Sequence, residues 1–216
     1  MAEDDCVVND GVPAGFVRRG RSCMVPAMVA APRYRHFTYD EYVELERDTG
    51  LKHEYLDGMV WAMAGGTPRH AMLILNLGSE LRVSLKGRPC QPYSSELKVR
   101  VRATTLTTYP DVSVICGPIE RAPEDRNAVM NPTLVAEVLS PSTERWDRHG
   151  KLQHYQQIPS LRHVLFVHVD EALVEHLELR DGQWHTTLHR PGDHVVLAAL
   201  DVALDVDALY ADLPEG

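Results

Sequence analysis

Two short apolar segments dominate the hydrophobic pattern of the chain, and each carries one acidic residue. The segments span residues 109–116 and 134–140, and their β-branched side chains predict buried strands. Asp111 and Glu137 lie within them, where an ionised carboxylate is costly unless a charge or a metal compensates for it. Because alternate side chains of a strand share a face, neighbouring strands in register would bring the two carboxylates to one point. This arrangement would suit a hard divalent cation.

Local signals predict the elements of the first half of the chain. Thr38-Tyr-Asp-Glu41 has the form of a capping box and predicts a helix to about residue 47. Residues 53–63 predict a β-hairpin that turns at Asp57-Gly58. Thr67-Pro68 predicts the N-cap and first position of a helix with a wide apolar face that ends near residue 87.

The second half of the chain predicts a further set of strands around one capped helix. Residues 96–102 alternate, with Leu97, Val99 and Val101 expected to face inward and Lys98, Arg100 and Arg102 outward. Residues 117–132 predict a surface loop. The remaining expected elements are a strand at 89–93, a helix at 144–157, a strand at 161–170, an antiparallel meander of 173–179, 183–189 and 195–199, and a short helix at 205–210. The predicted fold class is α/β (α+β mixed), with a central mixed β-sheet flanked by helices.

Length and charge narrow the class of protein. A chain of 216 residues suits one domain, which we place at 37–216, after an N-terminal extension at 1–36 that we expect to be mobile. Met24 and Met28 are alternative starts to Met1. The net charge of −9 argues against a protein that coats nucleic acid nonspecifically, but it leaves room for a local basic groove.

The cysteines and the apolar runs bear on the compartment. Cys6, Cys23, Cys90 and Cys116 are scattered without CxxC spacing, which predicts free thiols of a cytoplasmic protein rather than disulfides. No apolar run reaches transmembrane length, so no membrane partner is expected.

Several short motifs occur together between residues 36 and 170. Pro110-Asp111 followed by Glu137 is the skeleton of the PD-(D/E)xK nucleases. The motifs that carry a more specific resemblance are residues 54–58, 68–70, 109–112 and 137–143, and the pattern Asp147-x-x-x-Lys151-x-x-x-Tyr155. This run resembles the Uma-two family, a branch of the restriction-endonuclease-like superfamily. The resemblance implies a restriction-endonuclease-like core, a divalent-metal-dependent endonuclease acting on nucleic acid, in particular DNA, and a homodimer.

The same resemblance implies roles for individual residues. Asp111 and Glu137 would be ligands of Mg²⁺, or of Mn²⁺ as a substitute, and Glu54 would be a third ligand or a water-orienting acid. Leu139 occupies the position where the superfamily pattern has its lysine. Lys151 on the following helix takes that place by position, and Asp147, one turn earlier, would hold its rotamer.

Each candidate residue also has a structural interpretation. Asp111 can simply cap the preceding loop, and Glu137 can form a buried ion pair with Lys98, Arg100 or Lys151. Glu54 can be a solvated hairpin residue. His70, Lys98 and Arg100 are candidates for phosphate contacts. A packing histidine explains His70 equally well, and a solvated basic face is the common explanation for the alternation of Lys98 and Arg100. His163 and His168 are expected to be structural and to lie on opposite faces of one strand.

The alternative function is a weakly active or inactive nucleic-acid-binding or interaction module of the same fold.

Overall fold

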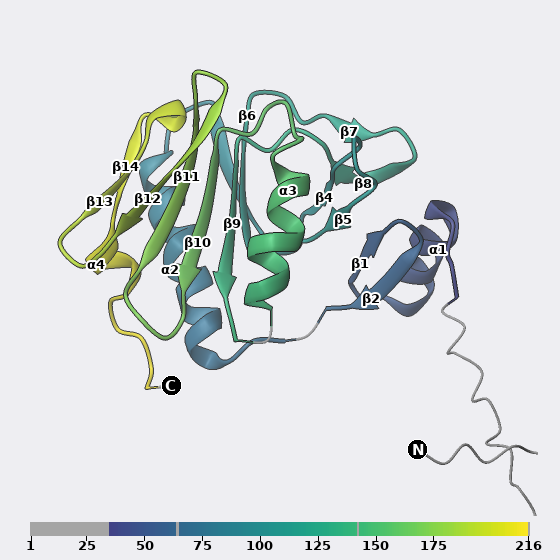
Figure 1. Ribbon diagram of the computed structural model, residues 1–216, viewed down its shortest axis with the longest axis horizontal. Coiled ribbons are helices and arrows are strands. Elements are labelled where there is room, and N and C mark those ends of the chain that lie inside the picture. Colours follow the sequence, from purple (N-terminus) through teal and green to yellow (C-terminus); the bar gives the residue numbers. More distant parts are fainter. Residues whose placement is uncertain (1–34, 64, 142, 216) are drawn as a thin grey trace, which may run out of the picture. The chain divides into compact units, whose positions relative to one another are not determined.

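Two six-stranded sheets carry the fold in this computed structural model, which describes residues 35–63, 65–141 and 143–215 (Figure 1). Residues 34–216 form one compact unit. The predictions for the N-terminal extension and for the alternative starts at Met24 and Met28 lie outside the described residues, apart from the last two positions of the extension.

The first sheet has the order β12-β11-β10-β9-β6-β3 and is mixed. Its β9 and β10 are parallel, and the helical segment between them provides the crossover that parallel neighbours need. The other neighbours are antiparallel. The strands are β3 (Cys90–Ser94), β6 (Val112–Cys116), β9 (Leu134–Leu139), β10 (His163–His168), β11 (Val174–Arg180) and β12 (Gln183–His189).

The second sheet has the order β2-β1-β5-β4-β8-β7 and includes the hairpin predicted at Asp57-Gly58. Its strands are β1 (His53–Leu56), β2 (Met59–Ala62), β4 (Lys98–Arg100), β5 (Thr107–Thr108), β7 (Arg121–Ala122) and β8 (Asp125–Val129). A third, two-stranded sheet pairs β13 (His194–Leu197) with β14 (Val202–Asp205). The 3-10 turn η2 (Ala198–Leu200) joins these two strands.

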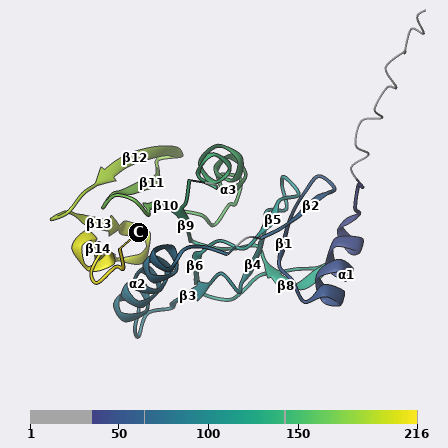
Figure 2. The same cartoon turned by 90° about the horizontal axis from the view of Figure 1, so that it is seen from below.

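Helices cover both faces of the first sheet, as Figure 2 shows. Helix α2 (Pro68–Ser84) begins at the predicted N-cap, Thr67, and buries Leu73, Leu77 and Leu81 against one face. The π-helix η1 (Trp146–Lys151) continues into α3 (Leu152–Tyr155), which packs Tyr155 on the other face. The remaining helices are α1 (Tyr39–Thr49), with the predicted capping box at Thr38, and α4 (Val206–Leu209). The predicted mixed fold with flanking helices and C-terminal antiparallel strands is confirmed.

Some local predictions were wrong. Residues 117–132 contain the paired strands β7 and β8 and are more than a surface loop. Lys98 and Arg100 do not face solvent, because they are 5% and 9% exposed and pair with acids of other segments. In the C-terminal region, the strand at 194–197 pairs with β14 instead of extending the meander.

The prediction of free thiols was wrong for Cys90 and Cys116, which form a disulfide between β3 and β6. The two residues are direct partners in the antiparallel register, so the sheet itself brings their side chains together. Cys6 and Cys23 lie outside the described residues. Among the described helices, none is both long enough and apolar enough to cross a membrane.

Candidate active site

The antiparallel register of β6 and β9 brings Asp111 and Glu137 together. Val112 pairs with Ala136, so Asp111, one residue before β6, lies opposite Glu137. The Asp111 backbone N–H lies 3.4 Å from Glu137 Oε2, and the Val138 N–H donates to Asp111 Oδ2 at 2.8 Å. Both carboxylates line one cavity of about 340 Å³. The spatial convergence that the strand pattern suggested is therefore present.

Lys151 reaches this pair of carboxylates from the last position of η1. Its Nζ lies 3.3 Å from Glu137 Oε1 and 2.8 Å from Glu54 Oε1. It also lies 2.9 Å from the buried Oδ1 of Asp147, one turn earlier, in a charge contact without hydrogen-bond geometry. Tyr155 donates to Glu137 Oε1 at 2.5 Å. Leu139, on the strand, cannot supply the cation of the superfamily pattern, and Lys151 from the helix places its ammonium group beside the same carboxylates.

Glu54 projects from β1 into the same cavity, and donors surround both of its oxygens. Thr108 donates to Oε1, which also contacts Lys151. The indole N–H groups of Trp61 and Trp146 donate to Oε2 at 2.9 and 3.0 Å. In this structure Glu54 therefore orients Lys151 and is itself held by two tryptophans.

Burial controls the ionisation of the site. Burial, together with the neighbouring carboxylates of Asp147 and Asp111, raises the pKa of Glu137 to about 8, although Lys151 acts in the opposite direction. Burial also raises the pKa of Asp111 above its usual value. For Glu54, burial favours the neutral form, but Lys151 and the hydrogen-bond donors outweigh it and lower the pKa.

Lys151 keeps its charge in this environment. Burial opposes the ammonium form, but the carboxylates of Glu137, Glu54 and Asp147 hold the pKa of Lys151 well above its usual value. The side chain is therefore a cation at neutral pH.

The donor set fits a hard divalent cation. Four carboxyl groups, those of Glu54, Asp111, Glu137 and Asp147, line the cavity with one lysine, so carboxyl oxygens outnumber the lysine as possible partners of a cation. No described residue donates a hydrogen bond to Asp111 Oδ1, so this oxygen is available to a ligand. Within the described residues no group of three or more His, Cys, Asp or Glu is arranged as a metal-binding cluster. A hard divalent cation can be held by one or two carboxylates together with several waters, so the fit does not depend on such a cluster.

The residues considered for phosphate contacts separate into two groups. His70, in the first turn of α2, lines the cavity, and its Nε2 lies 2.9 Å from the Val138 carbonyl oxygen and 3.7 Å from Asp111 Oδ2. Lys98 and Arg100 do not line it. Lys98 instead pairs with Glu46 and Asp125 at 2.6 and 2.7 Å, and Arg100 pairs with Glu124 at 2.8 Å.

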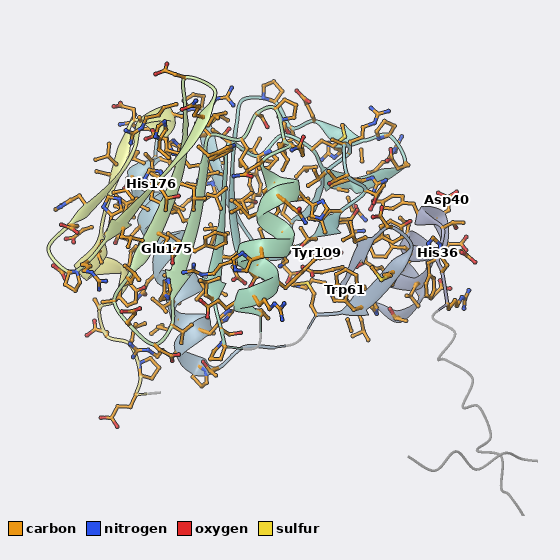
Figure 3. All side chains as sticks on the ribbon, viewed as in Figure 1. His36, Asp40, Trp61, Tyr109, Glu175 and His176 are labelled. Atoms are coloured by element: carbon orange, nitrogen blue, oxygen red, sulfur yellow. A yellow bond between two sulfur atoms is a disulfide. The ribbon has the colours of Figure 1, made fainter. Side chains whose placement is uncertain are left out.

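Sequence reasoning missed the aromatic part of the site. Trp61 and Trp146 lie edge to face, with ring centroids 5.6 Å apart. Both line the cavity together with Tyr109 (Trp61 and Tyr109 are labelled in Figure 3). Gly150 permits this packing, because a Cβ there would lie 1.9 Å from Trp146 Cε3. No spacing in the sequence connects Trp61 to Trp146, but the glycine next to Lys151 was a signal of close packing.

His163 and His168 lie on opposite faces of β10, outside the cavity. His163 is fully buried, and its Nδ1 lies 2.9 Å from Nε2 of His176. The side chain of His168 pairs with Glu175 at 2.7 Å. Both histidines have protein partners, in agreement with a structural role.

Comparison with known proteins places this site in a family. A family model described as "Uma2: Putative restriction endonuclease" matches residues 39–207, a span that contains every candidate site residue. An uncharacterized protein of Synechocystis sp. (strain ATCC 27184 / PCC 6803 / Kazusa), slr1290, is 34% identical over 81% of this chain and 91% of its own. A second uncharacterized protein of that organism, sll1609, is 30% identical over 74% of this chain and 91% of its own.

A solved structure has the same fold. The crystal structure described as a putative nuclease belonging to DUF820 from Anabaena variabilis ATCC 29413 matches with a TM-score of 0.67. The match covers 81% of this chain and 98% of that chain at 20% sequence identity. At this identity the likeness establishes the fold alone.

Proposed function

The chain belongs to the Uma2 family of restriction-endonuclease-like proteins, and on that premise we propose that it is a divalent-metal-dependent endonuclease that hydrolyses phosphodiester bonds in DNA. The observation that carries this proposal is the contact of Lys151 Nζ with Glu137 Oε1 at 3.3 Å, beside Asp111. Carboxylates that can hold a metal ion, with a lysine cation beside them, are a combination suited to metal-dependent phosphodiester hydrolysis.

Each side chain has a distinct role in the proposed mechanism. Asp111 and Glu137 would hold Mg²⁺, with Mn²⁺ as a substitute. When bound, the ion would polarise the phosphate and lower the pKa of the attacking water. Lys151 would stabilise negative charge as it develops on the phosphate, and its protonated state at neutral pH suits this role.

Supporting roles follow from the contacts around Lys151. Glu54 and Asp147 would keep the ammonium group in place, at 2.8 and 2.9 Å from its nitrogen. If Glu54 is itself a metal ligand, as the family resemblance implies, it must give up some of its contacts with Lys151, Thr108 and the two tryptophans. His70, in the first turn of α2, would contact the phosphate.

Replacement of Glu137 by glutamine tests the proposal directly. The variant keeps the shape of the side chain but removes its charge, so we expect plasmid cleavage in Mg²⁺ to fall by a factor of roughly a hundred or more. Glu178→Gln is the matched control, because Glu178 is also buried, at 6% exposed, but lies on β11 outside the cavity. Equal cleavage by wild type and Glu137→Gln would refute the assigned site.

Metal binding can be measured separately from cleavage. Since a ligand that binds only the folded state stabilises it, Mg²⁺ should raise the unfolding midpoint of the wild type. It should raise that of Glu137→Gln and Asp111→Asn much less. If Mg²⁺ leaves the wild-type midpoint unchanged and no cleavage occurs, the alternative of an inactive interaction module is favoured.

The proposal extends to the assembly and the compartment. A homodimer would place two sites on one duplex, and sedimentation of the purified protein measures the oligomeric state directly.

We retain the cytoplasmic location as a proposal, but the cysteines no longer support it, because Cys90 and Cys116 are bonded to each other.

A further inference from the structure

A second cavity, of about 580 Å³, lies next to the candidate site. Residues of α1, the segment before β1, β4 and the β7–β8 hairpin line it. Tyr109 lines both this cavity and the candidate site, and it directly precedes Pro110-Asp111. The two cavities therefore share Tyr109 as a common wall residue.

The rim of this second cavity is basic, although the whole chain has a net charge of −9. Arg121 on β7 and Arg126 on β8 are exposed, and no described residue forms an ion pair or a side-chain hydrogen bond with either guanidinium group. Both arginines also line an adjoining hollow of about 550 Å³. Two unpaired cations thus stand between neighbouring depressions of the same surface.

Two further cations on the rim have exposed acidic partners. Lys52 pairs with Glu96, whose side chain is 79% exposed, and also donates to the Ser95 carbonyl oxygen at 3.2 Å. Arg47, with a side chain 68% exposed, lies 3.7 Å from Glu44 and 3.5 Å from Asp48. Because exposed pairs of this kind contribute little to stability, a phosphate can replace the acidic partner at little cost.

At the floor of the cavity, in contrast, the charged groups are paired with one another. Lys98 pairs there with Glu46 and Asp125, and the hydroxyl group of Tyr109 donates to Glu46 at 2.9 Å. Two acids against one lysine leave one net negative charge at the floor, which is smaller than the combined charge of the rim cations. Tyr109, the aromatic residue of the lining, is only 7% exposed, so it offers no face on which a base could stack.

We propose that the rim formed by Arg47, Lys52, Arg121 and Arg126, here called the basic groove, binds the phosphate backbone of nucleic acid that extends beyond the cleaved bond. This inference rests on the proposed function and adds a binding surface to it. Exposed cations without stacking aromatics contact phosphates rather than bases, so binding at the groove is independent of sequence. Phosphates that follow the groove would lead the chain past Tyr109 to Asp111 and Glu137.

The groove is tested with the double variant Arg121→Ala/Arg126→Ala of the full chain. Binding is measured by fluorescence anisotropy with a labelled duplex DNA of several helical turns, and with single-stranded DNA and RNA, in EDTA so that no cleavage occurs. Loss of two phosphate contacts should weaken duplex binding on the order of tenfold at moderate salt and lower the salt slope by about 2. Arg180→Ala/Arg190→Ala removes the same charge from exposed positions outside the groove and should bind like the wild type.

The outcomes distinguish the groove from the catalytic proposal. Hydrolysis of a small phosphodiester, which cannot reach the groove, should be unchanged in Arg121→Ala/Arg126→Ala. Wild-type affinity in this variant, an equal loss in the control pair, or equally tight binding of polyglutamate would overturn the groove while leaving the site intact. If the wild type hydrolyses no phosphodiester, the proposed function fails, whatever the binding result.

Discussion

Replacing Lys151 by methionine would test the electrostatic basis of the site. The substitution preserves an unbranched side chain of similar length but removes the one lysine or arginine among the described residues that line the cavity. Lys151 is 5% exposed, so water cannot take over its contacts. Glu54, Glu137 and Asp147 would then face one another without a cation.

The expected cost is large because the charges that remain are buried. Removing one partner of a buried ion pair destabilises a protein by about 3–5 kcal/mol, a considerable part of a total stability of about 5–15 kcal/mol. We expect Lys151→Met to lower the free energy of unfolding by an amount in this range at pH 8. Lys52→Met is the control, since its partner Glu96 is 79% exposed, and it should cost less than about 1 kcal/mol.

The loss should also depend on pH. The pKa of Glu137 is about 8 in the folded protein against 4.5 for an ordinary glutamate, so the folded state binds a proton more tightly than the unfolded state does. Stability from this group is therefore highest at low pH and falls as the pH rises from 4.5 toward 8. Without Lys151 the fall in stability with rising pH should become steeper, because protonation of the remaining buried carboxylates would then also stabilise the folded state.

Urea denaturation at pH 5.5 and at pH 8, with EDTA present, measures these effects. Adding Glu54→Gln to Lys151→Met should restore part of the stability at pH 8, since it removes one of the unpaired charges. The reasoning is refuted if Lys151→Met costs less than about 1 kcal/mol at pH 8, or if its cost is the same at both pH values.

Two further predictions concern packing and acid stability. Gly150→Ala should destabilise the protein by about 1–3 kcal/mol and reduce cleavage, because the new Cβ would displace Trp146. Gly78→Ala is the control, because Gly78 lies in open space on α2, and it should stabilise the protein by up to about 1 kcal/mol. Equal changes in the free energy of unfolding of the two variants, measured by urea denaturation, would contradict this explanation. Burial lowers the pKa of His163 and His176 from 6.5 to about 4, so their contribution to stability is complete above pH 6.5 and is lost as the pH falls toward 4. His176→Gln should reduce this loss, and an unfolding midpoint with the same pH dependence in wild type and variant would argue against it.

Elements set by neighbouring residues could be predicted from the sequence. The capping box at Thr38, the hairpin at Asp57-Gly58 and the N-cap at Thr67 each depend on a few adjacent side chains, and the structure contains all of them. Helix 144–157 was predicted in the correct place, but its first turn is a π-helix. No pattern in the sequence distinguishes this π-helical turn from an ordinary α-helical one.

Features set by distant partners could not be predicted. Lys98 alternates with apolar residues as an exposed side chain would, but Glu46 and Asp125, from other parts of the chain, allow it to be buried. Cys90 and Cys116 are 26 residues apart, and only the register of β3 with β6 makes them partners. For the site, strand alternation suggested that Asp111 and Glu137 converge, and family resemblance suggested Lys151.

The π-helix at Trp146–Lys151 makes the number of residues before Lys151 as important as their identity. Each residue of an α-helix turns the chain by about 100°, so deleting one residue between Trp146 and Lys151 would restore ordinary helical hydrogen bonding but rotate the ammonium group away from Glu137. An insertion would rotate it in the other direction. Lengthening or shortening this segment would therefore separate the lysine from the carboxylates even if every site residue were retained.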